Sequence, residues 1–244
     1  SVVEGSITTD VDYQNIDSTL IIYWTGSDSA SGVSAYEYAL GTTSGGDETI
    51  NWASAGTSTA DTLTGLSLTE GSTYYLSIRA TDAAGNVSAV STADGITIDL
   101  TAPSGSTVSD GTGDDITYTG SDTTLSAVWA AFTETVSGIA KYEYAIGTSS
   151  GGTDIVTWTS NSTDTTVTKT GLSLTSGSTY YVSVRATDNA GNVATAVNSD
   201  GVTVDTAAPV AGTIIDGTET DIDWTNSTSA LVATWSGFSD TLSG

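Results

Sequence analysis

The 244-residue chain contains no cysteine, no histidine and no methionine, and only four of its residues are basic. Without cysteine or histidine it cannot form disulfides, a zinc finger, a thiol nucleophile or a Ser-His-Asp triad. Against the four basic residues stand 29 acidic ones, which gives a formal charge of −25. Because nucleic acids and anionic membranes are bound through clustered lysine and arginine, the charge argues against both as partners.

Long apolar runs are also missing. No stretch approaches the roughly 18 apolar residues that cross a bilayer, so we expect no direct membrane insertion. The chain starts with Ser-Val-Val instead of Met, and we expect it to be a mature or internal piece of a longer protein. Hydrophobic residues make up 37% of it, enough for cores of ordinary size. Two prolines, 27 glycines and abundant serine and threonine suit short strands and polar turns better than helices.

What the chain does contain is an internal repeat. The segment Leu-Ser-Leu-Thr-Glu-Gly-Ser-Thr-Tyr-Tyr at 66–75 returns with one substitution at 172–181, an offset of 106 residues. Trp24, Trp129 and Trp235 follow at nearly the same spacing. A period of this size is close to that of a common domain.

The repeat predicts the domain organisation. We expect one copy at 1–100, a second at 101–206 and the start of a third at 207–244. A third copy of this length has too few strands to close a core alone, so we expect the natural protein to continue.

Within a copy, apolar residues alternate with polar ones. In the segment 180–186, one face carries Tyr180, Val182, Val184 and Ala186, while the residues between them point the other way. Similar short segments are separated by turns rich in Gly, Asn and Asp, and no helical periodicity occurs. The fold class predicted is all-β, with tandem antiparallel β-sandwiches of about 100 residues each.

The segment from Leu174 to Ala186 resembles the fibronectin type III pattern Leu-x-Pro-Gly-Thr-x-Tyr-x-Val-x-Val-x-Ala, and Leu68 to Ala80 resembles it too. In both copies the proline of the pattern is missing. The resemblance implies an Ig-like Greek-key sandwich with a tyrosine corner near the start of one strand. It assigns structural roles to the corner residues Tyr74 and Tyr180 and to the strand-B core residues Trp24, Trp129 and Trp235.

The motif Ala-Thr-Asp-x-Ala-Gly-Asn occurs at 80–86 and 186–192. Together with the Pro-containing joints 99–103 and 205–209, it resembles the tandem Ig-like and fibronectin-like repeats of prokaryotic surface proteins and large adhesins. The resemblance implies an extracellular location on the prokaryotic cell surface.

The composition points to calcium as a ligand, because hard cations bind carboxylate oxygens and the chain is rich in acidic residues. Acidic residues recur in two loops and at the joint between copies, and in a seven-strand sandwich these segments meet at one pole. We therefore predict calcium sites at two junctions and in the loops of the first copy. The candidate ligands are Asp99, Glu134 and Asp188 at the first junction, Asp205 and Asp240 at the second, and Asp28 and Asp82 in the first copy.

The alternative for these acidic residues is that each caps its own turn through hydrogen bonds to the main chain. The stretches 110–115 and 221–223 are weaker candidates for metal binding, because they lack the full spacing of a calcium loop.

Aromatic residues offer one further candidate site. Trp52 and Trp158 follow Gly-Gly turns and could stack on a sugar, although cross-strand packing is the other interpretation. No enzyme is predicted, because the acidic residues recur with the domain and fall in turns, where solvated carboxylates are common.

These observations favour stalk or spacer modules of an extracellular prokaryotic surface protein, an adhesin, with neighbouring repeats of the same chain as partners. One alternative is a subunit of an S-layer or extracellular filament, in which like chains are the partners. The other is a glycan-binding module that uses Trp52 and Trp158.

Overall fold

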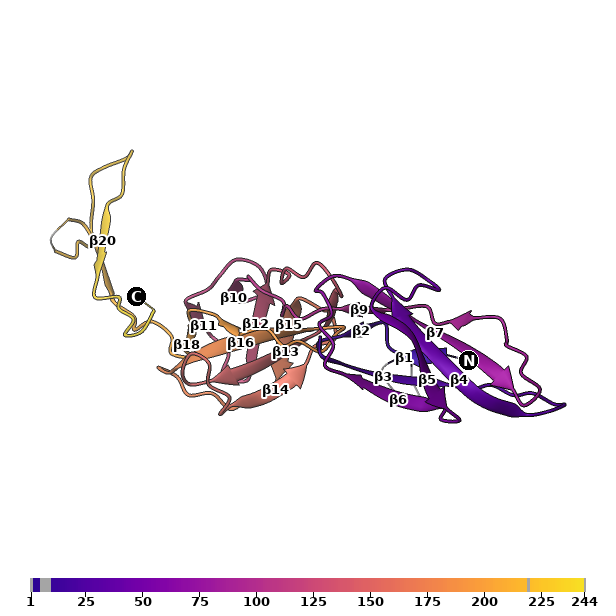
Figure 1. Ribbon diagram of the computed structural model, residues 1–244. Helices are drawn as coiled ribbons and strands as arrows, with labels where there is room; N and C mark the ends of the chain where they lie inside the picture. Colours follow the sequence, from indigo (N-terminus) through magenta and orange to yellow (C-terminus); the bar gives the residue numbers. More distant parts are fainter. Residues whose placement is uncertain (1, 5–9, 219, 244) are drawn as a thin grey trace. The chain divides into compact units, whose positions relative to one another are not determined.

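The computed structural model describes residues 2–4, 10–218 and 220–243, and these residues form strands and turns without a helix (Figure 1). No helix in this part of the chain is long and apolar enough to span a membrane.

The first repeat is a sandwich of two sheets. One sheet has the order β1-β3-β6, with antiparallel pairing throughout. The other has the order β2-β9-β7-β4-β5, and the short β8 also pairs with β7. The strands are β1 (Val2–Glu4), β2 (Tyr13–Gln14), β3 (Thr19–Trp24), β4 (Val33–Gly41), β5 (Ile50–Gly56), β6 (Ala60–Thr64), β7 (Thr73–Asp82), β8 (Ser91–Thr92) and β9 (Ile96–Ile98).

The second repeat has the same strand order. Its sheets are β10-β12-β15 and β11-β18-β16-β13-β14, with β17 paired to β16. The strands are β10 (Val108–Asp110), β11 (Tyr118–Thr119), β12 (Thr124–Trp129), β13 (Ile139–Gly147), β14 (Val156–Ser160), β15 (Thr166–Thr170), β16 (Thr179–Asp188), β17 (Val197–Asn198) and β18 (Val202–Val204).

The strand order confirms the predicted fold class: these are tandem all-β sandwiches of fibronectin type III-like and Ig-like Greek-key topology. In each repeat the chain leaves the three-stranded sheet after its first strand and crosses to the other sheet. There the next strand runs parallel to the last strand of the repeat, as in β2 with β9 and β11 with β18. The other strand pairs are antiparallel.

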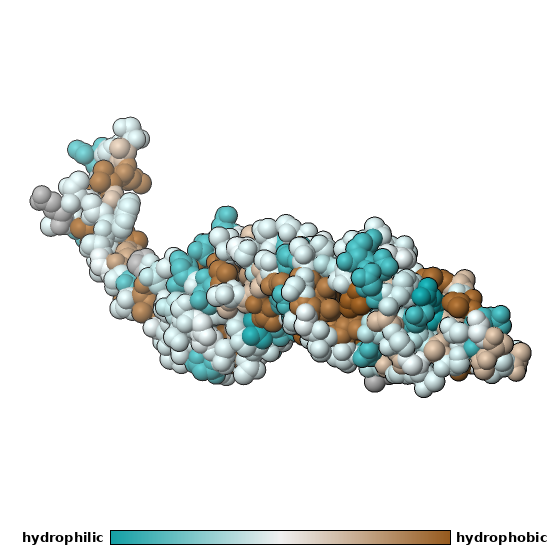
Figure 2. Space-filling model, in the orientation of Figure 1, coloured by the Kyte–Doolittle hydropathy of each residue, from teal (hydrophilic) through white to brown (hydrophobic). Residues whose placement is uncertain are grey.

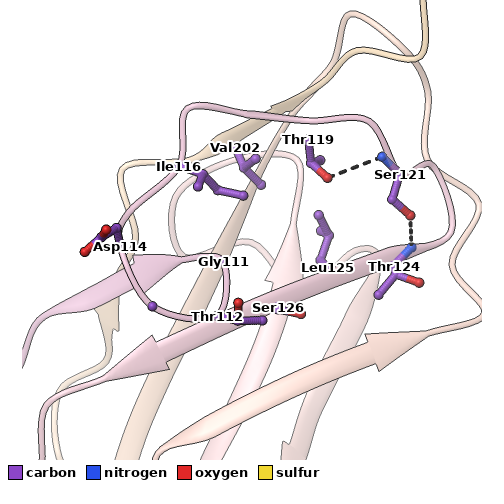
Figure 3. A pocket seen from close by; sticks show the side chains of 11 residues that line it. Gly111, Thr112, Asp114, Ile116, Thr119, Ser121, Thr124, Leu125, Ser126 and Val202 are labelled. Atoms are coloured by element: carbon purple, nitrogen blue, oxygen red, sulfur yellow. Dashed lines mark hydrogen bonds between the residues drawn. The ribbon is translucent and has the colours of Figure 1, made fainter.

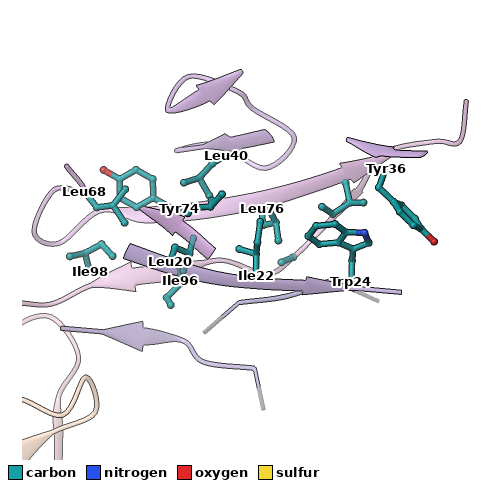
Figure 4. Packing of buried hydrophobic residues seen from close by; sticks show 13 residues of the cluster. Leu20, Ile22, Trp24, Tyr36, Leu40, Leu68, Tyr74, Leu76, Ile96 and Ile98 are labelled. Carbon is teal, nitrogen blue, oxygen red and sulfur yellow. The ribbon is translucent and has the colours of Figure 1, made fainter. Parts of the chain in front are cut away.

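The core of the first repeat lies between its two sheets. Leu20, Ile22 and Trp24 on β3 point towards Leu76 on β7 and Ile96 on β9 (Figure 4). Four of these five side chains have no exposed surface, and Trp24 is 2% exposed. The alternation that places every second residue of β3 inside is the physical basis of the period-two pattern in the sequence.

The two tyrosine corners have matching geometry. The hydroxyl of Tyr74 accepts a hydrogen bond of 3.0 Å from the main-chain N–H of Thr69, and Tyr180 accepts one of 2.9 Å from Thr175. Both tyrosine rings are buried. Each hydroxyl satisfies an amide in the turn that precedes its own strand, as the fibronectin resemblance implies.

Residues 207–244 differ from the two complete repeats. They contribute only the antiparallel pair β19 (Thr213–Asp216) and β20 (Ala233–Ser236) to the described structure. Trp235, for which the sequence period predicts a core position, is 72% exposed, because no second sheet formed by the described residues covers the hairpin. This segment is yellow in Figure 1. Figure 2, in the same orientation, shows brown, hydrophobic residues exposed on it.

The chain divides into two compact units. The first consists of Ser1–Gly105, Phe132–Tyr142 and Arg185–Thr195, and the second consists of Ser106–Ala131, Glu143–Val184 and Ala196–Gly244. Two segments of the second repeat, which include the start of β13 and the end of β16, thus belong to the first unit. The repeat boundaries at residues 100 and 206 stay predictions.

Candidate metal centre

Three carboxylates meet in the first compact unit. One carboxylate oxygen from each of Asp99, Glu134 and Asp188 lies within 4.8 Å of the other two. Asp99 directly follows β9, Glu134 lies in the loop before β13, and Asp188 ends β16. These are the three residues that the sequence predicts to converge at the first junction. Asp99 has no exposed surface and Asp188 is 2% exposed, while Glu134 is half-buried.

Main-chain and side-chain amides hold the cluster in place. The Asp99 carboxylate accepts hydrogen bonds from the N–H groups of Thr101 and Ser137, both at 3.2 Å. The Asp188 carboxylate accepts two bonds from Asn192, one from its main-chain N–H and one from its side-chain amide, both at 2.8 Å. Asp188 therefore caps its own turn, which is the alternative role that the sequence offers.

The hydrogen-bond donors to the cluster do not neutralise its negative charge. The donors to Asp99 and Asp188 are neutral amides, so they add no formal positive charge beside the three acidic side chains. Burying carboxylates without a neutralising charge is unfavourable. The hydroxyl of Ser137 is also buried, and it has no hydrogen-bond partner among the described residues. Carboxylate and hydroxyl oxygens belong to the donor set that calcium takes.

The corresponding loops of the first repeat bring Asp28 and Asp82 to one hollow of about 190 Å³. The Asp28 carboxylate accepts the N–H groups of Ala30, Ser31 and Gly32, and these bonds hold its pKa below the ordinary value. The side chain and main chain of Asn86 lower the pKa of Asp82 in the same way. Both residues are turn caps that share a hollow.

Asp205 and Asp240, the pair predicted for the second junction, each cap a turn of the main chain. The carboxylate of Asp205 accepts the N–H of Ala207 at 3.0 Å, and that of Asp240 accepts the N–H groups of Leu242 and Ser243. Among the described residues they are not part of a group of three acidic ligands. The counterpart of Asp188 in the third copy is not within these 244 residues.

Trp52 is part of a stack across three adjacent strands. The guanidinium of Arg79 on β7 lies 4.3 Å from the centre of the Trp52 ring on β5. The Arg79 Nε also lies 2.8 Å from a carboxylate oxygen of Glu37, which is on the intervening β4. One face of the Trp52 ring is thus covered by a cation. Trp158, its counterpart, is half-buried on β14. The glycan-contact role of both residues stays a prediction.

A hollow of about 350 Å³ lies in the second unit, between the loop 111–116 and β12 (Figure 3). Ile116, Leu125 and Val202 point into it, and the main-chain N–H of Thr124 donates a hydrogen bond of 3.1 Å to the hydroxyl of Ser121 at its rim. Its lining is mainly apolar side chains and hydroxyls, with Asp114 as its acidic member. This composition offers no pair of acid and base groups for catalysis.

Two further carboxylate groups were not recognised from the sequence. They are Glu4 with Asp10 and Asp94, and Asp110 with Asp115 and Asp200. The stretch 110–115 stood out by composition, but its partner Asp200 did not. The sequence does contain a signal for Asp200. The 106-residue offset carries Glu4 onto Asp110 and Asp94 onto Asp200, so an acidic residue recurs at both positions.

No family model matches the chain. Among curated proteins, it is 38% identical over 161 residues to exoglucanase B of Cellulomonas fimi, which covers 63% of this chain and 13% of that protein. It is 34% identical over 193 residues to chitinase A1 of Niallia circulans, covering 78% of this chain and 24% of that protein. The chain thus spans less than a quarter of the length of either curated relative.

Among solved structures, the chain is similar to the FN1-FN3 domains of chicken CNTN1, with a TM-score of 0.42 and 15% identity over 77% of this chain and 64% of that one. A structure of titin domains has a TM-score of 0.49 and 11% identity over 84% of this chain and 66% of that one.

Proposed function

We propose that the chain is an array of non-catalytic spacer modules in an extracellular bacterial protein. The observation that carries the proposal is the repetition of one sandwich, with the same strand order and the same tyrosine corner, at an offset of 106 residues. The acidic candidate residues recur with the repeat in its loops. A module built for spacing needs a stable core and defined ends, and both repeats have these features.

The curated relatives support this reading. Both carry the names of enzymes that act on glucan or chitin chains, yet the matched segment is 13% of one and 24% of the other. A segment of this share, composed of repeated sandwiches whose acidic residues cap loops, fits an accessory part of a longer secreted protein. We favour a cell-surface stalk because the chain is strongly acidic and repetitive.

The spacer role is tested by small-angle scattering of the 244-residue chain. An extended particle is expected. A compact particle, with the repeats folded against each other, would contradict the proposal. Incubation with soluble cellulose and chitin oligosaccharides is the companion experiment, and release of shorter sugars would show a catalytic function instead.

Calcium is the proposed ligand of the Asp99–Glu134–Asp188 cluster. The three side chains come from the end of one repeat and from two loops of the next, yet they belong to one compact unit. A bound cation would neutralise the carboxylates and add bonds between these segments, which stiffens the chain where one repeat follows another.

The joint site has a matched control within the chain. Asp188→Asn removes a cluster ligand, and Asp82→Asn removes the equivalent turn cap from the first repeat, which has no counterpart of Asp99 before it in this sequence. We expect millimolar calcium to raise the melting temperature and lengthen the particle for wild type and for Asp82→Asn. For Asp188→Asn the lengthening is lost. If calcium changes the particle length of neither wild type nor variants, the carboxylates are turn caps and the spacer function stands without a metal at the joint.

A further inference from the structure

Asp110 is a fully buried carboxylate at the end of β10 in the second unit. One of its oxygens, Oδ2, accepts the main-chain N–H of Gly201 at 3.1 Å. The other, Oδ1, is buried and has no hydrogen-bond partner among the described residues. Burying a carboxylate oxygen without a hydrogen-bond partner is unfavourable, and a bound ligand would remove that cost.

Two more carboxylates complete a group around this aspartate. Asp115 lies in the loop that follows β10, and Asp200 lies in the loop between β17 and β18. One oxygen from each of the three side chains lies within 4.8 Å of the other two. Asp115 is fixed in the group by the main-chain N–H of Asp110, which donates to it at 2.7 Å.

The charges that face Asp110 have its own sign. The pKa of Asp110 is raised to about 6, chiefly by burial. The negative charges of Asp115 and Asp200 also raise it, while hydrogen bonds from Ser199 and Gly201 lower it. The buried carboxylate of Asp110 therefore lies beside two further negative charges, those of Asp115 and Asp200.

The same arrangement occurs in the first repeat. Glu4 ends β1 without exposed surface, and its Oε2 is buried and unpartnered among the described residues. Its carboxylate is grouped with those of Asp10 and Asp94 within the same 4.8 Å limit. The main-chain N–H of Glu4 donates to Asp10 at 3.3 Å, as that of Asp110 donates to Asp115. Glutamate replaces aspartate, yet the unpartnered buried oxygen persists.

The start of the third copy contains the same loop. The main-chain N–H of Asp216 donates to the carboxylate of Asp221 at 3.1 Å, and the N–H of Ile222 donates back to the carbonyl of Asp216 at 2.9 Å. Asp216 and Asp221 correspond to Asp110 and Asp115 at the 106-residue offset. The acidic pair thus recurs in all three copies.

We propose that Asp110, Asp115 and Asp200 form a calcium site within the second sandwich, and that Glu4, Asp10 and Asp94 form its equivalent in the first. The buried unpartnered oxygen of Asp110 or Glu4 is the inner ligand, and the two exposed aspartates of each group close the site towards solvent. This site is separate from the Asp99 cluster, with which it shares no residue.

The chemistry of calcium fits this group. Calcium binds six to eight oxygens at roughly 2.3–2.6 Å in flexible geometry, so oxygens on opposite sides of the ion lie about 5 Å apart. Three carboxylate oxygens within 4.8 Å of one another satisfy that limit. Water supplies the remaining ligands on the exposed side. The ion would tie the end of β10 to the loop before β18, which pins the first strand of the sandwich to its last.

The test uses the 244-residue chain with calcium chloride as the only added ligand, after removal of metal by a chelator. Calorimetric titration gives the number of ions bound, and amide NMR spectra report where they bind. We expect the N–H signal of Gly201 to shift on calcium addition. We also expect Asp115→Asn and Asp200→Asn each to remove one ion from the stoichiometry. Both residues are exposed, so these variants keep the buried core intact even if Asp110→Asn fails to fold.

Asp114→Asn is the matched control, because it removes the same charge from the same loop at a residue outside the group. It keeps the wild-type stoichiometry. Asp188→Asn, which disrupts the separate joint cluster, keeps the Gly201 shift. The proposal is overturned if Gly201 is insensitive to calcium, or if Asp115→Asn and Asp200→Asn bind as many ions as Asp114→Asn.

Discussion

The side-chain amide of Asn192 donates a hydrogen bond of 2.8 Å to the main-chain carbonyl of Asp99, 93 residues earlier in the chain. The same amide donates to the carboxylate of Asp188 within its own turn. Asn86, its counterpart in the first repeat, makes the turn bond to Asp82 but, among the described residues, no bond to an earlier segment. One side chain has therefore gained a tertiary role through its position in the array.

This difference predicts unequal effects of the same substitution. Asn192→Ala and Asn86→Ala both remove a turn bond, but Asn192→Ala also leaves a main-chain carbonyl without its donor. We expect Asn192→Ala to lower the free energy of unfolding by about 1 kcal/mol more than Asn86→Ala. Urea denaturation followed by tryptophan fluorescence measures both. Equal losses would mean that the bond to Asp99 contributes nothing in solution.

The tyrosine corners lead to a prediction that should hold in both repeats. In Tyr74→Phe and Tyr180→Phe the ring stays in the core, but the N–H of Thr69 or Thr175 loses its acceptor. Each substitution should lower the free energy of unfolding by about 1–2 kcal/mol. Tyr118→Phe is the control, because its side chain is 43% exposed, and it should leave stability unchanged. A loss in only one repeat would show that the two corners are not equivalent.

The fold was predictable because its determinants are local and repeated. Alternation along segments such as 180–186 identifies strands, and the Tyr-x-Val-x-Val-x-Ala pattern identifies the strand that the tyrosine corner begins. The convergence of Asp99, Glu134 and Asp188 was also predictable, because sandwich topology places their segments at one end. These inferences need the order of the strands and not their detailed packing.

Other features depend on packing that a pattern does not contain. Trp235 matches Trp129 in sequence, yet it is exposed because burial requires an opposing sheet. Glu4 reads as an ordinary acidic residue near a chain end, and only the structure shows that its side chain has no exposed surface. Asp94 and Asp200 lie about 90 residues after their partners, so no local motif connects them.

The Arg79 stack predicts a modest contribution to stability. Arg79→Ala removes both the cation above Trp52 and the ion pair with Glu37. The side chains of Arg79 and Glu37 are each 33% exposed. Because solvent screens such contacts, we expect a loss of about 0.5–1 kcal/mol in thermal or urea unfolding. Arg79→Lys should retain part of it.

If Trp52 is instead a sugar platform, the wild type binds on a glycan array, and Trp52→Ala combined with Trp158→Ala abolishes that binding. A wild type that binds no glycan, or a variant that binds as the wild type does, contradicts that role.

The metal-free protein should lose stability as the pH rises through the range in which Asp110 ionises. Its pKa is raised in the folded state from 3.8 to about 6, chiefly by burial. Between these values the folded chain holds a proton that the unfolded chain has released, so the folded state is favoured at the lower pH. Two pKa units at about 1.4 kcal/mol each correspond to a penalty of about 3 kcal/mol that is complete above pH 6.

Asp110→Asn carries no charge to ionise and should lack this penalty. In chelator, the melting temperature of wild type should therefore fall more steeply between pH 4 and pH 7 than that of Asp110→Asn. The two curves should approach each other at the acid end. Asp114→Asn should follow wild type, because Asp114 lies outside the buried group. Parallel curves for Asp110→Asn and wild type would show that Asp110 ionises as freely as an exposed aspartate, and hence that its carboxylate is hydrated in solution.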